Sequence, residues 1–181
     1  MSLGEAFPGV LAAAKTGAEW AWDRLYSDLA GAVTGYLTTR GASDPEDLAG
    51  ETFLQVARNI HGFDGSEGAF RSWVFVIAHR RLIDYRRANG RRPNSFVLDV
   101  DPEGGNVESE AVERLTTSEL VTAFKVLTEE QREVLSLRVI ADLTLEETAE
   151  VVGKSVGAVK GLQRRALETM RETVEAETVT K

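Results

Sequence analysis

The sequence predicts an all-α protein made of two small helical domains joined by a flexible acidic linker. Apolar residues recur at three- and four-residue spacing in nearly every periodic segment, for example from Leu48 to Ile60. No stretch alternates strictly between apolar and polar residues, so no strand is expected. Capping residues mark several helix starts, and the periodicity fails only between Gly90 and about Glu113.

Helix starts are the clearest local signals. Asp44 is expected to be an N-cap because Pro45 follows it at the first helical position and Asp47 lies in the first turn. Three further pairs have the spacing of a capping box, in which two side chains satisfy each other's free backbone N–H groups. These pairs are Thr116 with Glu119, Thr128 with Gln131, and Thr144 with Glu147.

The stretch "GRRPNSFVLDVDPEGGNVESE" divides the chain. It holds two prolines, three glycines and a run of acids, which favours a linker over a packed element. We therefore expect an N-terminal helical domain over residues 1–92, an acidic linker over 93–113, and a C-terminal domain over 114–181. Each domain is small but long enough for a packed helical bundle.

Composition excludes several classes of protein. The 181 residues are 43% hydrophobic and contain no cysteine, so the chain can fold but has no disulfide or thiolate metal site. Only His61 and His79 could supply imidazole ligands, and we expect neither a metal nor a cofactor.

The apolar run "FPGVLAAA" precedes its first cation, which is the wrong polarity for a secretory signal. No stretch reaches the roughly 20 apolar residues of a membrane span, so we expect a cytoplasmic protein without membrane insertion.

The net charge of −8 hides a strongly segmented pattern. Residues 71–92 carry seven arginines and one acid, and residues 152–171 carry five cations and one acid. The intervening residues 93–151 hold fourteen acids against four cations. Two basic segments separated by an acidic one indicate two nucleic-acid contacts within an acidic protein.

The C-terminal basic segment predicts a helix-turn-helix. A capped helix from Thr144 should end near Val152, Gly153 supplies the turn, and Ser155 caps a basic second helix. At 100° per residue the second helix should bury Val156, Val159, Leu162, Ala166 and Met170. Its opposite side carries Gly157, Ala158, Lys160, Gly161, Arg164 and Arg165, together with Glu168. The alternative is an amphipathic hairpin whose basic face is merely solvated.

Two other sequence motifs lack the structural context that their usual function requires. "GKSVG" matches the G-x-S-x-G nucleophile elbow, but a helix precedes it where that motif requires a strand. "DVDPEGGNVESE" approaches a calcium-binding loop, yet no helix leads into it and Glu103 replaces the usual Asp or Asn. We therefore expect neither a hydrolase nor a calcium site.

Taken in order, the motifs resemble those of the extracytoplasmic-function (ECF) subfamily of bacterial sigma factors. The matching segments are "EDLAGETF", "GFDGSEGAFRSW", "RRLIDYRRANGRRP", "LTEEQREVL" and "EETAEVVGKSVGAVK". They run from about Ala18 to Arg171 in the family's order and spacing. The resemblance implies a non-enzymatic factor that binds core RNA polymerase and directs promoter-specific transcription initiation, and it implies that an anti-sigma factor is a further partner. The alternative is a two-domain helix-turn-helix regulator that binds operator DNA unaided.

The resemblance also implies a role for particular residues. The outer strip of the helix that begins after Asp44 would dock on core polymerase through Asp47, Glu51, Leu54 and Gln55. The glycine-rich loop would capture a flipped base of the −10 element through Phe63, Asp64, Gly65 and Ser66. The arginine-rich helix would contact −10 DNA through Arg80, Arg81, Asp84, Arg86 and Arg87. The second helix of the helix-turn-helix would read the −35 element through Ser155, Gly157, Ala158, Lys160, Gly161, Arg164 and Arg165.

This chain departs from the family pattern at a few positions. Gly50 replaces a glutamine on the docking helix, and Ala158, Gly161 and Leu162 replace polar residues on the −35 helix. Val76 and Ile77 stand where primary sigma factors carry a tryptophan pair, which implies weaker strand melting.

Several aromatic residues have structural interpretations. Phe70, Trp73 and Phe75 are expected in the core, and Trp20 and Trp22 in the core or on a domain face. His79 falls on the arginine side, where it would contact phosphate or solvent.

Overall fold

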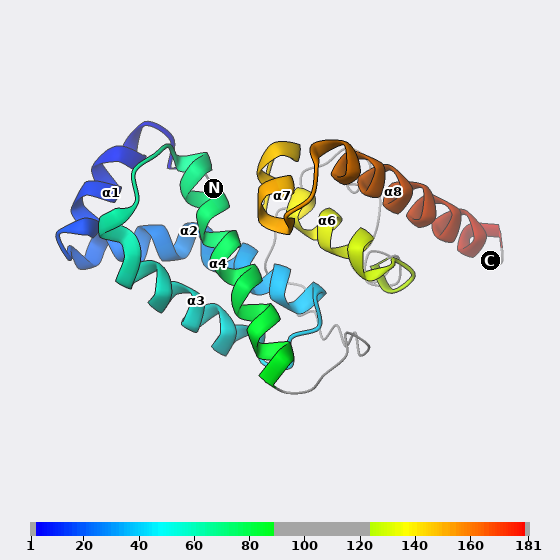
Figure 1. The fold of residues 1–181 in the computed structure, drawn as a ribbon, viewed down its shortest axis with the longest axis horizontal. Coiled ribbons are helices and arrows are strands. Elements are labelled where there is room, and N and C mark those ends of the chain that lie inside the picture. The colour runs from blue at the N-terminus through cyan, green and yellow to red at the C-terminus, as the bar shows by residue number, and fades with distance from the viewer. Residues whose placement is uncertain (1–2, 89–123, 180–181) are drawn as a thin grey trace.

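The computed structural model describes residues 3–88 and 124–179. All the secondary-structure elements assigned within these residues are helices (Figure 1). The predicted all-α fold is confirmed. The elements are η1 (Gly4–Ala6), α1 (Phe7–Lys15), α2 (Glu19–Thr39), α3 (Pro45–Asn59), η2 (Ile60–Gly62), α4 (Glu67–Ala88), α6 (Glu129–Val139), α7 (Leu145–Val152) and α8 (Val156–Val179). The predicted linker, residues 93–113, and the pair Thr116 with Glu119 lie outside the described residues.

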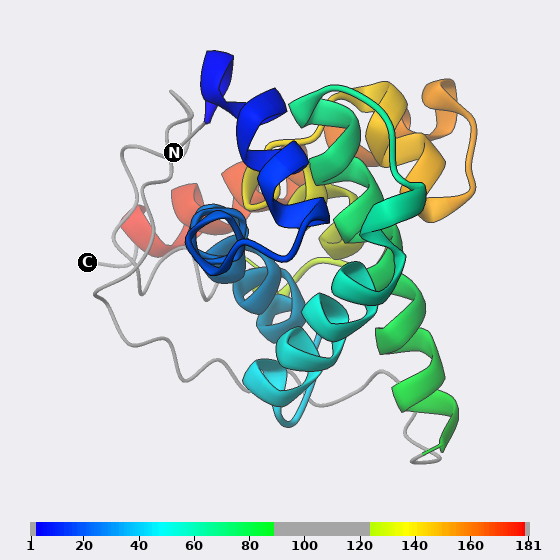
Figure 2. The same ribbon diagram turned by 90° about the vertical axis from the view of Figure 1, so that its left-hand side faces the viewer.

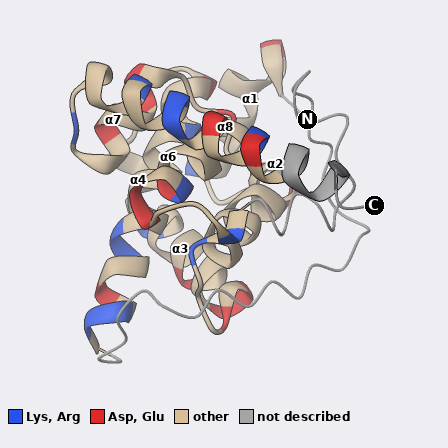
Figure 3. Ribbon diagram, turned by 90° about the vertical axis from the view of Figure 1, so that its right-hand side faces the viewer, with Lys and Arg blue, Asp and Glu red and all other residues tan. Residues whose placement is uncertain are grey.

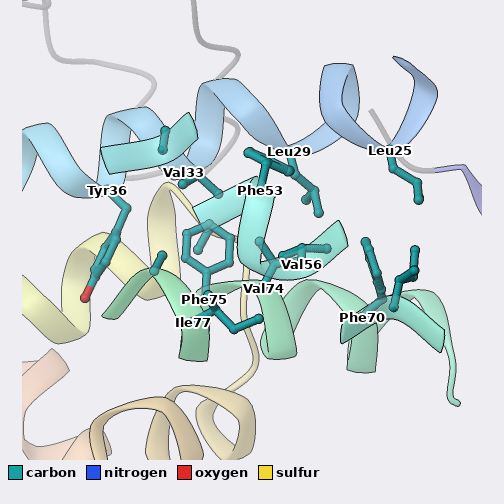
Figure 4. Close-up of a cluster of buried hydrophobic side chains, with 14 of the residues drawn as sticks. Leu25, Leu29, Val33, Tyr36, Phe53, Val56, Phe70, Val74, Phe75 and Ile77 are labelled. Atoms are coloured by element: carbon teal, nitrogen blue, oxygen red, sulfur yellow. The ribbon is translucent and has the colours of Figure 1, made fainter. Parts of the chain in front are cut away.

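The core of the first domain lies between α2, α3 and α4 (Figure 4). Leu25, Leu29 and Val33 follow each other at four-residue spacing along α2 and are buried. The rings of Tyr36 and Phe75 meet edge to face with their centroids 5.7 Å apart. Phe70 and Phe75 are buried as expected, and Trp73 packs against the same core from its edge. The apolar stripe of each helix therefore fixes how α4 lies against α2 and α3.

Helix α1 is not among the helices predicted from the sequence. The run that begins with Phe7 lacks the charge pattern of a secretory signal and forms a helix that buries Phe7, Val10, Leu11 and Ala14. Their spacing of three, four and seven residues is that of one helical face, so the signal was present. Trp22 ties α1 to α2 by donating its indole N–H to the carbonyl of Ala14 at 3.1 Å.

The predicted caps are confirmed wherever the structure describes them. The Asp44 carboxylate accepts a hydrogen bond from the N–H of Asp47 at 3.0 Å. Complete capping boxes begin α6, between Thr128 and Gln131, and α7, between Thr144 and Glu147.

The second domain packs α8 across α6 and α7 around two small apolar clusters. Val159 and Leu162 face Val134 and Ala149 in one of them, and Ala166 and Met170 belong to the other. The expectation that Val156 is buried was wrong, because its side chain is 39% exposed. It lies in the first turn of α8, one turn before the helix meets Val134 through Val159.

The two domains are not separate bodies in this structure. Leu137, Ala141, Leu143 and Val151 of the second domain join the hydrophobic cluster of the first. Helices α6 and α7 lie against α2 and α4, which the two ribbon views agree on (Figures 1 and 2). At Gly35 of α2 the approach is so close that a Cβ would stand 3.1 Å from Cγ2 of Ile140. No pattern in the sequence indicates this contact.

Two glycines allow the turn of the helix-turn-helix to be tested by the same substitution with opposite results. Gly153 ends α7 with φ +65°, a left-handed conformation that disfavours any residue with a Cβ. We expect Gly153→Ala to lower the free energy of unfolding by about 1 kcal/mol. Gly157 lies within α8 with open space around a Cβ, so Gly157→Ala should raise it by up to about 1 kcal/mol.

Chemical denaturation followed by circular dichroism measures both changes. Equal shifts in the two variants would contradict the assigned turn.

Candidate nucleic-acid interface

Helix α4 presents a partly open basic face. Arg80 and Arg87 are exposed, and Asp84 is exposed beside them, 3.7 Å from the guanidinium of Arg87. The charge-coloured view shows Lys and Arg bands recurring toward the C-terminal end of α4 (Figure 3). Exposed guanidinium groups on one helix suit the phosphate oxygens of DNA, because they bind anions through several N–H donors.

Two other arginines of the predicted −10 set are already engaged. Arg81 lies 3.5 Å from the carboxylate of Glu51 and 3.4 Å from the amide oxygen of Gln55, both on α3. Arg86 donates to Glu129 of α6 at 2.5 Å and to the backbone carbonyl of Arg40. The sequence places both on the basic helix but does not show these partners.

The predicted base-capture loop is anchored at one end and open at the other. The Phe63 ring stacks on Trp73 with centroids 5.1 Å apart and meets Phe70 edge-on at 5.2 Å. Asp64, Gly65 and Ser66 are exposed. Phe63 therefore holds the loop on the core, and the three residues after it are exposed, with the Ser66 hydroxyl accepting a hydrogen bond from the N–H of Ala69 at 3.3 Å.

The outer strip of α3 borders a shallow hollow of about 490 Å³. Asp47 and Glu51 are exposed, Gln55 is half-buried, and Leu54 is 58% exposed. Gly50 leaves open space where a side chain would stand, and α3 continues through it unbroken. Tyr26 of α2 also lines the hollow; it is half exposed, and its ring packs on Phe53 with centroids 4.8 Å apart. Tyr26 was not predicted, since nothing in the sequence relates it to α3.

The second helix of the helix-turn-helix exposes the predicted side. Ser155 accepts a hydrogen bond from the N–H of Ala158 at 3.2 Å, which confirms it as the cap of α8. The residues of the predicted −35 set that are fully exposed are Ser155, Gly157, Ala158, Lys160, Arg164 and Arg165, while Gly161 is half-buried beside Arg165. Arg164 pairs with Glu168 at 3.6 Å on the helix surface, where such pairs are weak and easily exchanged.

Comparison with known proteins shows to which family a chain with these surfaces belongs. The family model of Sigma-70 region 2 matches residues 22–92, and that of Sigma-70 region 4 matches residues 123–172. The ECF RNA polymerase sigma factor ShbA of Streptomyces griseus is 38% identical over 136 residues, which cover 72% of this chain and 71% of ShbA. The chain belongs to the ECF sigma factors.

Other relatives are similar over much of the chain. The ECF sigma factor BldN of Streptomyces coelicolor is 33% identical over 162 residues, which are 87% of this chain and 61% of BldN. SigD of Mycobacterium tuberculosis is 31% identical over 145 residues, covering 76% of this chain and 66% of SigD. The chain thus spans about three fifths to seven tenths of the length of these three relatives.

Two solved structures are similar to this sigma factor. The first, CnrH in complex with the cytosolic domain of CnrY, superposes with a TM-score of 0.65 at 25% identity, over 92% of this chain and 96% of that one. The second, RpoE in complex with the anti-sigma factor NepR from Bartonella quintana, has the same TM-score at 21% identity and covers 84% and 95% of the two chains. The second likeness shows the fold alone.

Over residues 3–88 and 124–179 of this sigma factor, no helix is both long and apolar enough to cross a membrane. The same ranges bring no three potential carboxylate or imidazole ligands together as a metal site.

The expectation that His79 contacts phosphate or solvent was wrong. His79 is half-buried, and its Nδ1 lies 3.0 Å from the hydroxyl of Tyr36 and 3.2 Å from the carboxylate of Glu133. Burial lowers the pKa of His79 below its ordinary 6.5, and Glu133 opposes that shift. Burial also raises the pKa of Tyr36, so its hydroxyl stays protonated. The histidine directly precedes Arg80 and Arg81 in the sequence, but its position on α4 turns it toward α2 and α6.

The lowered pKa of His79 predicts an acid-sensitive fold. Well above pH 6.5 the ring is neutral in both the folded and the unfolded chain, so its titration does not reduce the free energy of unfolding. As the pH falls below 6.5, the unfolded chain takes up a proton first, so stability is lost down to the lowered pKa. We expect thermal melts at pH 7.5 and 5.5 to differ less for His79→Gln than for the wild type.

His61→Gln is the matched control because it removes the chain's other histidine, which is exposed. A control that flattens the pH dependence as much as His79→Gln would contradict the assignment to His79.

Proposed function

We propose that this chain binds core RNA polymerase and directs promoter-specific transcription initiation. The observation that carries the proposal is the ordered pair of Sigma-70 region 2 and region 4 matches, each lying on a domain with an exposed basic face. A sigma factor needs two DNA contacts and one polymerase contact, and the structure offers a surface suited to each.

The −10 contact falls on α4 and the loop before it. Arg80 and Arg87 are open to phosphate, and Asp64 to Ser66 form the exposed part of the loop that would receive a flipped base. Extruding a base costs a few kcal/mol, which a receiving pocket must offset. Val76 is half-buried and Ile77 is buried, so neither supplies an exposed aromatic wedge. We therefore expect melting to depend on the promoter sequence.

The −35 contact falls on α8. Its first turns expose Ser155, Gly157, Ala158 and Lys160, and the N-terminal part of such a helix is what reaches base edges in the major groove. Arg164 and Arg165 follow one turn later, where they would contact the DNA backbone. Gly157 and Ala158 have small side chains, so DNA can approach α8 more closely there than larger side chains would allow.

The polymerase contact falls on the outer strip of α3. Asp47 and Glu51 give it acidic edges, and Leu54 gives it an apolar centre that is 58% exposed. This combination suits a basic amphipathic helix, which could bury the leucine and pair with the acids. Gln55 lies at the margin, where it accepts a hydrogen bond from Arg81.

An anti-sigma factor is the further partner we propose. Two structural neighbours are found in complexes: CnrH with the cytosolic domain of CnrY, and the sigma factor RpoE with the anti-sigma factor NepR. Because polymerase and promoter DNA lie in the bacterial cytoplasm, we place the activity there.

The decisive experiment is run-off transcription with purified core polymerase on a library of randomised promoters. We expect the full chain to select a defined pair of −35 and −10 elements. Absence of any selective transcript would contradict the proposal.

The alternative is a regulator that binds operator DNA without polymerase. It predicts specific binding of the chain alone to duplex DNA. The region 2 match does not favour it, since an operator-binding protein needs only the helix-turn-helix.

The exposed arginines of α4 give a sharper test. We expect Arg80→Ala with Arg87→Ala to weaken the promoter complex of the holoenzyme, and to reduce the slope of log K against log salt by ~2 through loss of two phosphate contacts. Filter binding at several salt concentrations measures both quantities.

Lys15→Ala with Arg24→Ala is the matched control, since it removes two cations of the same domain outside α4. Binding to core polymerase should remain intact in both double variants. Parallel loss of core binding by the α4 variant would show that this face was misassigned.

A further inference from the structure

The N-terminal segment, residues 3–15, is tied to the start of α4 by two hydrogen bonds. The carboxylate of Glu67, the first residue of α4, accepts from the backbone N–H of Leu3 at 2.6 Å and from that of Gly4 at 2.9 Å. Both N–H groups lie at the start of η1, where a helix has no backbone acceptors of its own for them. Hydrogen bonds to a carboxylate are among the strong ones. Glu67 therefore fixes where the N-terminal segment begins.

Aromatic rings make a second connection between the same segments. Phe7 of α1 packs on Phe70 of α4 with ring centroids 5.6 Å apart, and Phe70 meets Phe63 edge-on at 5.2 Å. Phe63 in turn stacks on Trp73 at 5.1 Å. Phe7 and Phe70 are only 3% and 2% exposed, so close packing holds their rings in place. We call Phe7, Phe63, Phe70 and Trp73 the aromatic cluster.

The two ribbon views agree that η1 and α1 lie beside the start of α4 and the loop before it (Figures 1 and 2). Helix α1 also contacts η2, the short turn that leads into this loop. The N-terminal segment therefore supports the base-capture loop, residues 63–66, from behind.

The shape of the base-capture loop depends on its two ends. At Gly65 the backbone folds so closely over the first residue that a Cβ would stand 3.1 Å from Cζ of Phe63. At the other end, the carbonyl of Ser66 accepts from the N–H of Phe70 at 2.9 Å, and its hydroxyl accepts from that of Ala69. One end thus rests on the aromatic cluster, and the other directly precedes Glu67.

A loop that receives an extruded base needs such support. Extruding a base from the stack is unfavourable, and a fitted pocket must offset the cost. Sites on loops are less precise than sites on helices unless surrounding residues lock their geometry. Asp64, Gly65 and Ser66 are exposed, so the residues that hold the loop in shape are those that pack behind it.

We propose that the N-terminal segment positions the base-capture loop for the −10 element, and that Glu67 and Phe7 are the positioning residues. Phe7 acts on Phe63 through Phe70, and Glu67 holds the start of α4 against η1. The proposal rests on the proposed function, whose −10 contact it deepens by adding residues that act on the loop without contacting DNA.

The test compares an intact base with a missing one. The probe is the promoter selected by run-off transcription, made single-stranded over the −10 element, with an abasic site placed at each −10 position in turn. We expect wild-type holoenzyme to bind the intact probe about tenfold more tightly than the probe lacking the captured base. Phe7→Leu keeps an apolar side chain but removes the ring, and Glu67→Gln offers one acceptor where two donors stand. Both should reduce that preference several-fold.

Matched controls separate positioning from stability. Leu11→Ala truncates another buried side chain of α1, outside the aromatic cluster, and should lower the melting temperature at least as much as Phe7→Leu. Glu19→Gln removes an exposed acid that likewise lies in the first turn of its helix, α2. Both controls should keep the wild-type preference for the base. An unchanged preference in Phe7→Leu and Glu67→Gln, or an equal loss in the controls, would overturn the proposal.

Hydrogen exchange of the free chain tests the support without DNA. We expect the backbone N–H groups of Phe63 and Phe70, which bond to Ile60 and Ser66, to exchange several-fold faster in Glu67→Gln than in Glu19→Gln. Equal exchange rates would contradict the positioning role. A wild-type holoenzyme without preference at any −10 position would instead contradict the proposed function of the loop, and exchange would still show whether the N-terminal segment holds it.

Discussion

The guanidinium of Arg40 lies at the point on which the arrangement of the whole molecule depends. Arg40 is the C-cap of α2 and is almost fully buried, and its guanidinium meets two carboxylates and a backbone carbonyl of α6. A buried charge without partners would cost several kcal/mol, so its presence requires Glu129 and Glu133 to be where they are. That requirement fixes α6 on α2, and α6 in turn carries α7 onto α4.

Local features of the fold could be predicted because they depend on neighbouring residues. The caps at Asp44, Thr128 and Thr144, and the left-handed turn at Gly153, each follow from side chains within a few positions of each other. Val156 was misplaced for a related reason. A helical wheel gives the side of a helix that faces the core, but not where along its length the core begins.

Features that depend on distant residues could not be predicted. Arg86 and Glu129 are 43 positions apart, and neither residue type reveals its partner when many acids and arginines are available. His79 illustrates the same limit, because its neighbours Tyr36 and Glu133 come from other helices. For the candidate site this means that the sequence identifies the basic helix, while only the structure separates the exposed arginines, Arg80 and Arg87, from Arg81 and Arg86, which are held by residues outside α4.

The sharing of one hydrophobic cluster by both domains has a consequence for dissecting the protein. Leu137, Ala141, Leu143 and Val151 are side chains of the second domain that complete the core of the first. A fragment ending after α4 would present the apolar surface they cover to water, and exposed apolar surface promotes self-association. We therefore expect the whole chain to unfold as one cooperative unit, and not as two domains divided at the boundary that the sequence motifs predict. Fragments cut at that boundary would not reproduce the properties of either domain in the whole chain.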